Sequence, residues 1–273
     1  MLKAELAAIK ELQATCEKYE PIKLKLNWDM LETRNDLEKN DFFYYEEQEL
    51  IGYLALYPFG NKVEVCGMVH PSHRRKGLFS ALFQQAKQVI EEQGFTSILL
   101  NTPAASKAGM EWTIAVGGKL KMSEHQMKWD RVTKTDLAPV ILRKSTLDDY
   151  KWEADLDVLC FGMTREDAES FTNRKHAENL ENFFIIEDEK QAVGKVRVQE
   201  LDGEAWIYGF AVHPNFQGKG IGRRTLSQLI NIYSQKDLDI CLDVEVENLH
   251  ALGLYESCGF RVTQGQDYYD YNI

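Results

Sequence analysis

The sequence lacks the marks of a membrane protein, a secreted protein or a zinc-bound protein. Its five cysteines are scattered and form no CxxC pair, which argues against a structural zinc site and against a disulfide framework. No apolar run approaches the roughly 20 residues that a membrane span requires. The first twenty residues are charged throughout and have no apolar signal-peptide stretch. We therefore expect a cytoplasmic protein with no metal and no membrane partner.

Positive charge is scarce in the second half of the chain. Residues 1–136 hold 18 Lys and Arg against 19 Asp and Glu, whereas residues 137–273 hold 14 against 24, within a total net charge of −11. Affinity for nucleic acid depends on cationic contacts with phosphate, so this balance argues against a nucleic-acid partner. A well-solvated surface explains the acidity, and a cationic small molecule or basic peptide as substrate is the alternative.

Two similar stretches lie half a chain apart. "VHPSHRRKGLFSA" at Val69–Ala81 and "VHPNFQGKGIGRR" at Val212–Arg224 align without gaps at an offset of 143 residues. This offset is close to half the chain length, which indicates a duplicated domain. The polar stretch 130–139, which ends in proline, marks the junction. We predict one domain over 1–136 and a second over 137–273.

Both halves predict the same order of helices and strands. In the second half, the patterns predict a strand at 139–145, a helix at 146–161, a hairpin at 182–200, a strand at 205–214, a helix at 223–235, a strand at 239–247, a short helix at 248–259 and a final hairpin at 260–273. The first half repeats this core behind two amphipathic segments. We expect an α/β fold (α+β layout) of two domains, each a mixed, mostly antiparallel, twisted sheet flanked by helices.

The second stretch has the composition of an anion-binding turn. A strand, a Gly-rich turn and a helix bring backbone N–H groups and the positive end of a helix dipole together. Gly218, Gly220 and Gly222 permit a tight turn and a close approach of the backbone to a ligand. Lys219, Arg223 and Arg224 add positive charge. The spacing fits neither GxxxxGK[ST] nor GxGxxG, and a plain surface turn is the alternative interpretation.

Several motifs together resemble one family. "QGKGIG" at Gln217–Gly222 is similar to the Q/R-x-x-G-x-G/A signature of the GNAT superfamily of N-acetyltransferases. "ENLHALGLYESCGF" at 247–260 is similar to the family's N-x-x-A-x-x-L-Y-E-x-x-G-F ending. The resemblance implies a tandem GNAT protein in which the C-terminal domain has intact motifs. It also implies acetyl-CoA as co-substrate and a small-molecule or peptide amine as acceptor.

The resemblance places coenzyme binding on the strand before the turn, on the turn and on two helix starts. The implied residues are Phe210, Ala211, Val212, Gln217, Gly218, Lys219, Gly220, Ile221, Gly222, Arg223 and Asn248. In the family, the turn binds the pyrophosphate, and the strand pairs with the pantetheine arm. Asn248 would cap its helix in any protein, so its presence does not distinguish helix capping from contact with the pantetheine arm.

Acetyl transfer requires a base near the amine and an acid near the thioester sulfur. Tyr255 matches the family's general-acid tyrosine, and a buried core aromatic is the other interpretation. Asp243 is the leading base, because it matches a glutamate of family members that acetylate protein N-termini, and Glu245 follows on the same strand face. Tyr208 and Glu204 are further candidates. For each acid, a solvated strand face is an equally good interpretation.

The first half keeps the layout but has lost the motifs. Phe79 stands where the signature has Gly or Ala, and the helix at 104–118 has no Tyr at the matching place. We expect this half to brace its neighbour, with weak coenzyme A binding as the alternative. The predicted function is transfer of an acetyl group from acetyl-CoA to a primary amine by direct attack in a ternary complex. Three alternatives stay open, namely a non-catalytic acyl-CoA-binding regulatory module, an enzyme active in both halves and a longer acyl donor, and the oligomeric state is unknown.

Overall fold

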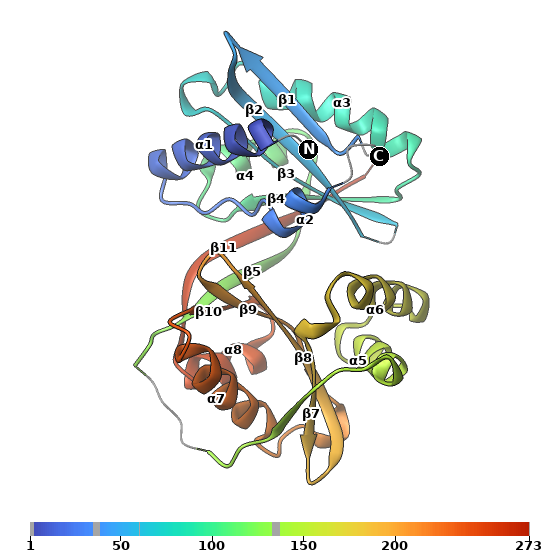
Figure 1. Ribbon diagram of the computed structural model, residues 1–273. Helices are drawn as coiled ribbons and strands as arrows, with labels where there is room; N and C mark the ends of the chain where they lie inside the picture. Colours follow the sequence, from blue (N-terminus) through green and yellow to red (C-terminus); the bar gives the residue numbers. More distant parts are fainter. Residues whose placement is uncertain (1–2, 35–38, 60, 133–136, 273) are drawn as a thin grey trace. The chain divides into compact units, whose positions relative to one another are not determined.

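The computed structural model describes residues 3–34, 39–59, 61–132 and 137–272 (Figure 1). Its contacts divide it into two compact units. Unit 1 comprises Met1–Glu124 and Gln264–Ile273, and unit 2 comprises His125–Thr263. Two strands, β5 (Lys119–Trp129) and β11 (Phe260–Tyr271), each begin in one unit and end in the other. The predicted boundary at 136/137 touches residues 133–136, which lie outside the described residues.

Unit 1 contains a sheet in the order β1-β2-β3-β4-β11. Its elements are α1 (Lys3–Tyr19), α2 (Trp28–Thr33), β1 (Asp41–Glu46), β2 (Glu49–Phe59), β3 (Lys62–Val69), α3 (Leu78–Glu92), β4 (Ser97–Pro103) and α4 (Lys107–Ala115). Only β3 and β4 pair in parallel among these neighbours, and the other described pairs are antiparallel. The sheet is therefore mixed and mostly antiparallel, as predicted.

The strand β2 separates two hydrophobic layers of unit 1. Tyr53 and Tyr57 belong to a buried cluster with residues of α1 and α2. Leu54 and Leu56 belong to a second cluster with residues of α3. Successive side chains of a strand point to opposite faces, so helices cover both faces of β2.

Unit 2 contains a sheet in the order β5-β10-β9-β8-β7-β6. Its elements are β6 (Ile141–Lys144), α5 (Tyr150–Phe161), α6 (Arg165–Asn179), β7 (Phe183–Asp188), β8 (Gln191–Leu201), β9 (Glu204–Val212), α7 (Ile221–Ser234), β10 (Asp239–Glu245) and α8 (Leu249–Ser257). The strands from β6 to β9 pair antiparallel, and β9 and β10 pair in parallel. On α7, Leu226, Leu229, Ile230 and Tyr233 are buried at the helical spacing that the sequence predicted.

The predicted hairpin over 260–273 is wrong, because β11 is one uninterrupted strand from Phe260 to Tyr271. Its residues Gln266–Tyr271 pair antiparallel with Ile98–Pro103 of β4. Gly265 is not among the glycines with positive φ, so the backbone stays extended there. This part of β11 pairs with the edge of β4, which is remote in sequence, so the local sequence pattern does not indicate the pairing.

No described helix combines the length and the apolar character that a membrane crossing requires.

Candidate functional site

The strands β9 and β10 pair only over their first residues. Their Cα partners run from Glu204–Asp239 to Ile207–Leu242, although β9 continues to Val212 and β10 to Glu245. Beyond Ile207, the described residues of β9 therefore have no ladder partner on the β10 side. A strand edge of this kind can pair with an extended ligand.

A bulge in β9 redirects the peptide groups at this point. The pairing of β9 with β8 shifts register between Lys195 and Arg197, and Gly209 has a φ of 54°. Gly209 and Phe210 thus stand opposite a single residue of β8, and the strand bends and twists more strongly here. A positive φ favours glycine, which explains the glycine within this otherwise apolar strand.

The end of β9 and the turn are joined by a side-chain hydrogen bond. The His213 N–H donates to Val193 O of β8 (2.8 Å). Alternate residues of a strand direct their peptide groups to opposite sides, so Ala211 faces β8 and Val212 faces the open side. The Val212 carbonyl accepts a hydrogen bond from Gln217 Nε2 (2.9 Å). The first residue of the signature is therefore fixed against the strand that the sequence assigned to the coenzyme.

The turn leads directly into the amino end of α7. Gly218 and Gly220 have φ values of 74° and 76°, in the left-handed region, and Gly220 caps the helix. The first N–H groups of a helix have no partner within it, so Ile221, Gly222 and Arg223 present theirs at the positive end of the dipole. Ile221 is buried in the core, and only its backbone can contribute to such a site.

Close packing and charge distinguish the residues of this turn. A Cβ added at Gly222 would lie 3.1 Å from Leu254 Cδ2, so a side chain here would crowd α8. Lys219 and Arg223 are exposed. Arg224, although adjacent, forms an ion pair with Asp188 (Nη2···Oδ1 2.9 Å). Lys219 and Arg223 are therefore the cations that the turn can offer to an anion.

The helix α8 holds the predicted acid. Asn248 caps its amino end, because the Asn248 Oδ1 accepts a hydrogen bond from the Ala251 N–H (3.1 Å), as the capping prediction requires. Tyr255 is 9% exposed, and its ring makes an edge contact with Phe260 (centroids 6.1 Å apart). Burial raises the pKa of the Tyr255 phenol to about 12, with a further contribution from Cys258. The hydroxyl is therefore protonated at neutral pH and can donate a proton.

The predicted bases lie on β10. Leu242 and Val244 are buried in the core of unit 2, whereas Asp243 is half-buried and Glu245 is exposed. Asp243 is the first residue after the last paired position, so it lies where β9 and β10 part. Glu245 lies at the end of β10, on the same face as Asp243.

The other base candidates, Tyr208 and Glu204, already have partners. The Tyr208 ring stacks on Trp206 (6.0 Å) and lies under the guanidinium of Arg197 (4.4 Å). Glu204 accepts a hydrogen bond from Trp206 Nε1 (2.8 Å). These contacts give both residues a role in holding the strand face.

Two further residues, His213 and Cys160, contact the end of β9 or the turn that follows it. His213 stacks on Trp152 (5.4 Å, 9° between planes) and its Nδ1 accepts a hydrogen bond from the Asn215 N–H (3.2 Å), which is a structural role. Cys160 Sγ lies 3.7 Å from Val212 O. Together with the bulge at Gly209, these contacts shape the end of β9. No group of three or more His, Cys, Asp or Glu in the described ranges is arranged to hold a metal ion.

Unit 1 repeats this arrangement without the bulge. β3 and β4 pair from Lys62–Ser97 to Val65–Leu100 and then part, while β3 pairs with β2 without a register shift. Arg75 (φ 63°) takes the place of Gly218, and Gly77 (φ 79°) caps α3. The backbone of the turn is thus conserved between the units, even where a non-glycine residue occupies the left-handed region.

Comparisons with known proteins agree on one family. A family model described as "Acetyltransferase (GNAT) family" matches residues 6–108 and 149–260. The [ribosomal protein bS18]-alanine N-acetyltransferase of Escherichia coli (strain K12) is 34% identical over 90 residues, which are 32% of this chain and 60% of that protein. The spermidine N(1)-acetyltransferase of Vibrio cholerae is 33% identical over 101 residues, 35% of this chain and 58% of that protein. The chain thus spans about 60% of the length of the curated relatives it matches.

Solved structures match the chain along its whole length. A GCN5-related N-acetyltransferase from Sphaerobacter thermophilus superposes with a TM-score of 0.80 at 19% identity, covering 100% of this chain and 94% of that one. A tandem GNAT protein from the clavulanic acid biosynthesis pathway gives a TM-score of 0.71 at 15% identity, covering 98% and 94%. At these identities, the likeness establishes the fold.

Proposed function

Because this chain belongs to the acetyltransferase (GNAT) family and carries two copies of its domain, we propose that unit 2 is an N-acetyltransferase that moves an acetyl group from acetyl-CoA to a primary amine. One observation carries the proposal: β9 parts from β10 beyond Ile207, next to a glycine turn at the positive end of α7. This arrangement offers an unpaired strand edge and an anion site side by side. A ligand with an extended arm and a diphosphate can use both.

The residues of the turn and of β9 would hold the coenzyme. The N–H groups between Gln217 and Arg223 bind the diphosphate, with Lys219 and Arg223 as counter-charges. In this proposal, the peptide groups of Phe210 and Val212 pair with the pantetheine arm along the open edge of β9, and Asn248 contacts the arm from the amino end of α8. Acetyl-CoA supplies the activated acyl group as a thioester. Gly222 has no side chain at the first turn of α7, which leaves its backbone open to a ligand, although the contact that a Cβ would make with Leu254 shows that packing against α8 also favours glycine here.

The remaining residues would move protons. Tyr255 donates its proton to the departing thiolate, which its buried and protonated state permits. Asp243 takes the proton of the attacking amine, directly or through a water, and Glu245 is the second choice. A backbone N–H at the bulge polarises the thioester carbonyl. The amine attacks directly while both substrates are bound.

We further propose a small or cationic amine as acceptor. The two relatives named above act, by their names, on spermidine and on an alanine of a ribosomal protein. In this chain, residues 137–273 carry 24 acidic against 14 basic residues, which favours a cation near the site. A polyamine or a peptide amino terminus fits both considerations.

The test is release of free thiol from acetyl-CoA by the full chain in the presence of a panel of polyamines, amino acids, aminoglycosides and peptides with free amino termini. We expect one class to raise the rate above background hydrolysis, and mass spectrometry to find the acetyl group on its amine. A non-catalytic acyl-CoA-binding module would bind the coenzyme in calorimetry, while no acceptor raised thiol release. That result would reject the enzyme.

A further inference from the structure

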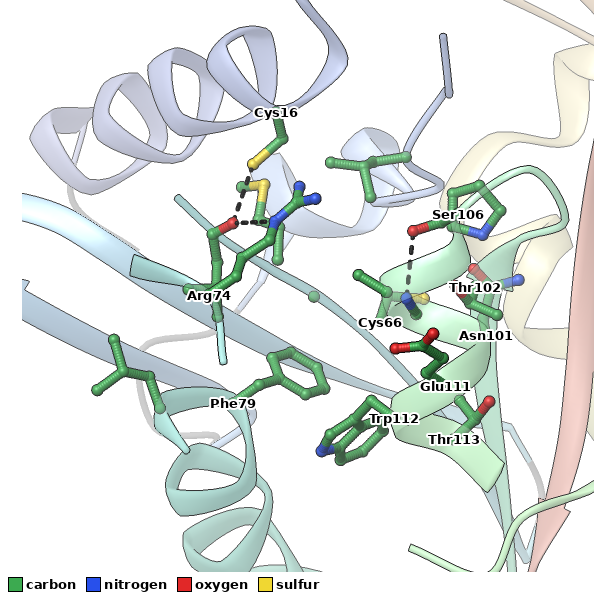
Figure 2. Close-up of a pocket in the computed structure, with 18 of the residues that line it drawn as sticks. Cys16, Cys66, Arg74, Phe79, Asn101, Thr102, Ser106, Glu111, Trp112 and Thr113 are labelled. Atoms are coloured by element: carbon green, nitrogen blue, oxygen red, sulfur yellow. Dashed lines mark hydrogen bonds between the residues drawn. The ribbon is translucent and has the colours of Figure 1, made fainter. Parts of the chain in front are cut away.

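Unit 1 contains a cavity of about 330 Å³ at the place where β3 and β4 part (Figure 2). Residues 65–69 of β3 and 101–103 of β4 line it, together with Ile22 and residues 24–26 after α1, the turn before α3, and α4. Its volume lies at the lower end of the range for small-molecule sites. The proposed acetyl transfer in unit 2 makes no use of this space.

The cavity lacks the acid that transfer chemistry would need. α4 and α8 hold matching places, 142 residues apart, and Thr113 therefore takes the place of Tyr255. The Thr113 hydroxyl donates to Met110 O (2.9 Å) and is 2% exposed. A buried threonine cannot replace a phenol as proton donor. The site can therefore bind a ligand but is not equipped to release a thiolate.

The two units differ in which element carries an aromatic ring beside this gap. In unit 1, Phe79 of α3 makes an edge contact with Trp112 (4.6 Å) and lies so close to β3 that a Cβ at Gly67 would be 2.7 Å from its ring. In unit 2 the ring belongs to β9, as Phe210, and the glycine to α7, as Gly222. The first turn of α3 thus presents a ring to the cavity where α7 presents bare backbone. The ring hinders the approach of a diphosphate to the backbone of this turn. An apolar ligand can pack against the same ring.

The cavity offers no unbalanced charge. Each charged side chain that lines it has a partner of opposite sign within unit 1. The pairs are Lys25–Glu124, His73–Glu46, Arg74–Glu20 and Arg75–Glu111. A charged ligand would have to break one of these pairs or remain uncompensated in a largely apolar site. The lining therefore favours an uncharged ligand.

Two polar groups of the cavity can complement an amide, namely the Asn101 side chain and the Gly67 peptide. Asn101 Nδ2 is buried and has no hydrogen-bond partner among the described residues, and its side chain lines the cavity (Figure 2). The His70 N–H donates to Ile51 O on β2 (2.8 Å), so strand alternation directs the peptide groups of Gly67 and Val69 into the gap beside β4. The Val69 carbonyl is taken by Arg74 Nε (3.1 Å). Gly67 remains as a donor and an acceptor for a ligand.

We propose that the cavity of unit 1 binds a compact, uncharged amide with an apolar body. The amide oxygen accepts a hydrogen bond from Asn101 Nδ2, and Gly67 pairs with the amide through its peptide groups. The apolar body packs against Met68, Phe79 and Trp112, which line the cavity. This inference does not depend on the activity of unit 2.

The experiment follows the fluorine signal of N-(4-fluorobenzyl)acetamide by NMR as the full chain is added. 4-Fluorobenzylamine and 4-fluorophenylacetate serve as cationic and anionic probes of similar size. Ala108→Phe fills the cavity from α4, and His250→Phe places the same ring at the matching position of α8. Asn101→Leu removes the buried donor at nearly constant volume. Thermal unfolding reports whether each variant is folded.

We expect the amide signal to broaden with the parent chain and with His250→Phe, and to stay sharp with Ala108→Phe. Asn101→Leu should weaken binding about fivefold or more. The proposal is overturned if the parent chain leaves the amide signal sharp, if Ala108→Phe broadens it as the parent does, or if either charged probe binds this cavity as well as the amide. Displacement of the amide from the parent chain by coenzyme A would likewise overturn it. Should Ala108→Phe fail to fold, an unchanged affinity in Asn101→Leu decides against the proposal.

Discussion

Burial in unit 2 raises the pKa of the Tyr255 phenol. Removing the phenol from water penalises the charged form, which raises its pKa to about 12. The phenol therefore carries its proton at pH 7, which is the state that a proton donor requires. This protonated state is compatible with the proposed role, and burial makes the phenol a weaker acid than an exposed tyrosine.

Tyr255→Phe should lower kcat by a factor of about 100 or more, since general acid catalysis contributes on that scale. The affinity for acetyl-CoA should change less than about threefold, because the ring itself remains. Thiol release gives the first quantity and calorimetry the second. Tyr233→Phe, another buried tyrosine of unit 2, is the control and should keep both values. An unchanged kcat in Tyr255→Phe would remove the phenol from the mechanism.

Asp149 shows how one ion pair makes unit 2 sensitive to acid. Arg143 donates two hydrogen bonds to its carboxylate (2.8 and 2.9 Å), and the Thr146 N–H donates a third (2.9 Å). These bonds lower the pKa of Asp149 to about 2. A folded pKa below the unfolded value means that the stabilisation is complete above about pH 4 and is lost as the pH falls towards 2.

Asp149→Asn should therefore cost about 1–2 kcal/mol of unfolding free energy at pH 7. The difference between variant and parent should shrink between pH 4 and pH 2. Urea unfolding of the full chain at several pH values measures it. Asp148→Asn changes an exposed neighbour and should show no such trend. A cost that is independent of pH would contradict the argument.

Among the structural elements, the bulge separates the two copies most clearly. The last paired residues, Val65 and Ile207, are 142 positions apart, whereas Val69 and Val212 are 143 apart. The additional residue in β9 is the bulge at Gly209. The ungapped alignment of the two turns hides this insertion, because it lies just before the aligned stretch.

Deletion of Gly209 should convert β9 into a regular strand like β3. We expect the fold to persist and kcat to fall at least tenfold, because the peptide groups at the open edge turn away from the thioester carbonyl. Circular dichroism checks the fold and thiol release checks the rate. Gly203→Ala imposes strain at another positive φ, in the turn between β8 and β9, and should lower stability without this loss of rate. Full activity after the deletion would exclude a role for the bulge.

Local patterns predict most elements but not those that depend on distant partners. Periodicity identified α7 because its apolar residues recur on one face, but α6 was not predicted, since its sequence is almost entirely polar. The turn at Gly218–Gly222 could be located from glycine spacing. The commitment of Arg224 to Asp188 could not, because the partner lies on β7. The sequence did not predict β11 as a single strand for the same reason, because its partner β4 is remote in sequence.

For the whole molecule, the two units share a backbone plan but differ in the side chains that a coenzyme would meet. Unit 2 has bare backbone at Gly222, where unit 1 has a ring at Phe79. Both turns keep a lysine, Lys219 and Lys76, at matching positions. Charge alone therefore does not decide which unit binds the coenzyme.

Calorimetry with coenzyme A should find one site per chain. Lys219→Glu should weaken this site at least tenfold, because it places an anion beside the diphosphate. The matched variant Lys76→Glu should leave the affinity unchanged. A stoichiometry of two, or equal effects of the two variants, would show that unit 1 binds the coenzyme as well.

The ten residues Gln264–Ile273 belong to unit 1, where Gln266 Nε2 donates to Lys23 O (2.8 Å) and Lys25 Nζ donates to the Tyr268 hydroxyl (2.6 Å). A nascent polypeptide leaves the ribosome from its amino end, at about 5–20 residues per second. In unit 1, which emerges first, the edge of β4 consequently stays unpaired until unit 2 and the end of β11 have been translated. An unpaired strand edge can pair with other chains. A chain that is released before its last ten residues are translated would therefore have an unpaired edge in unit 1.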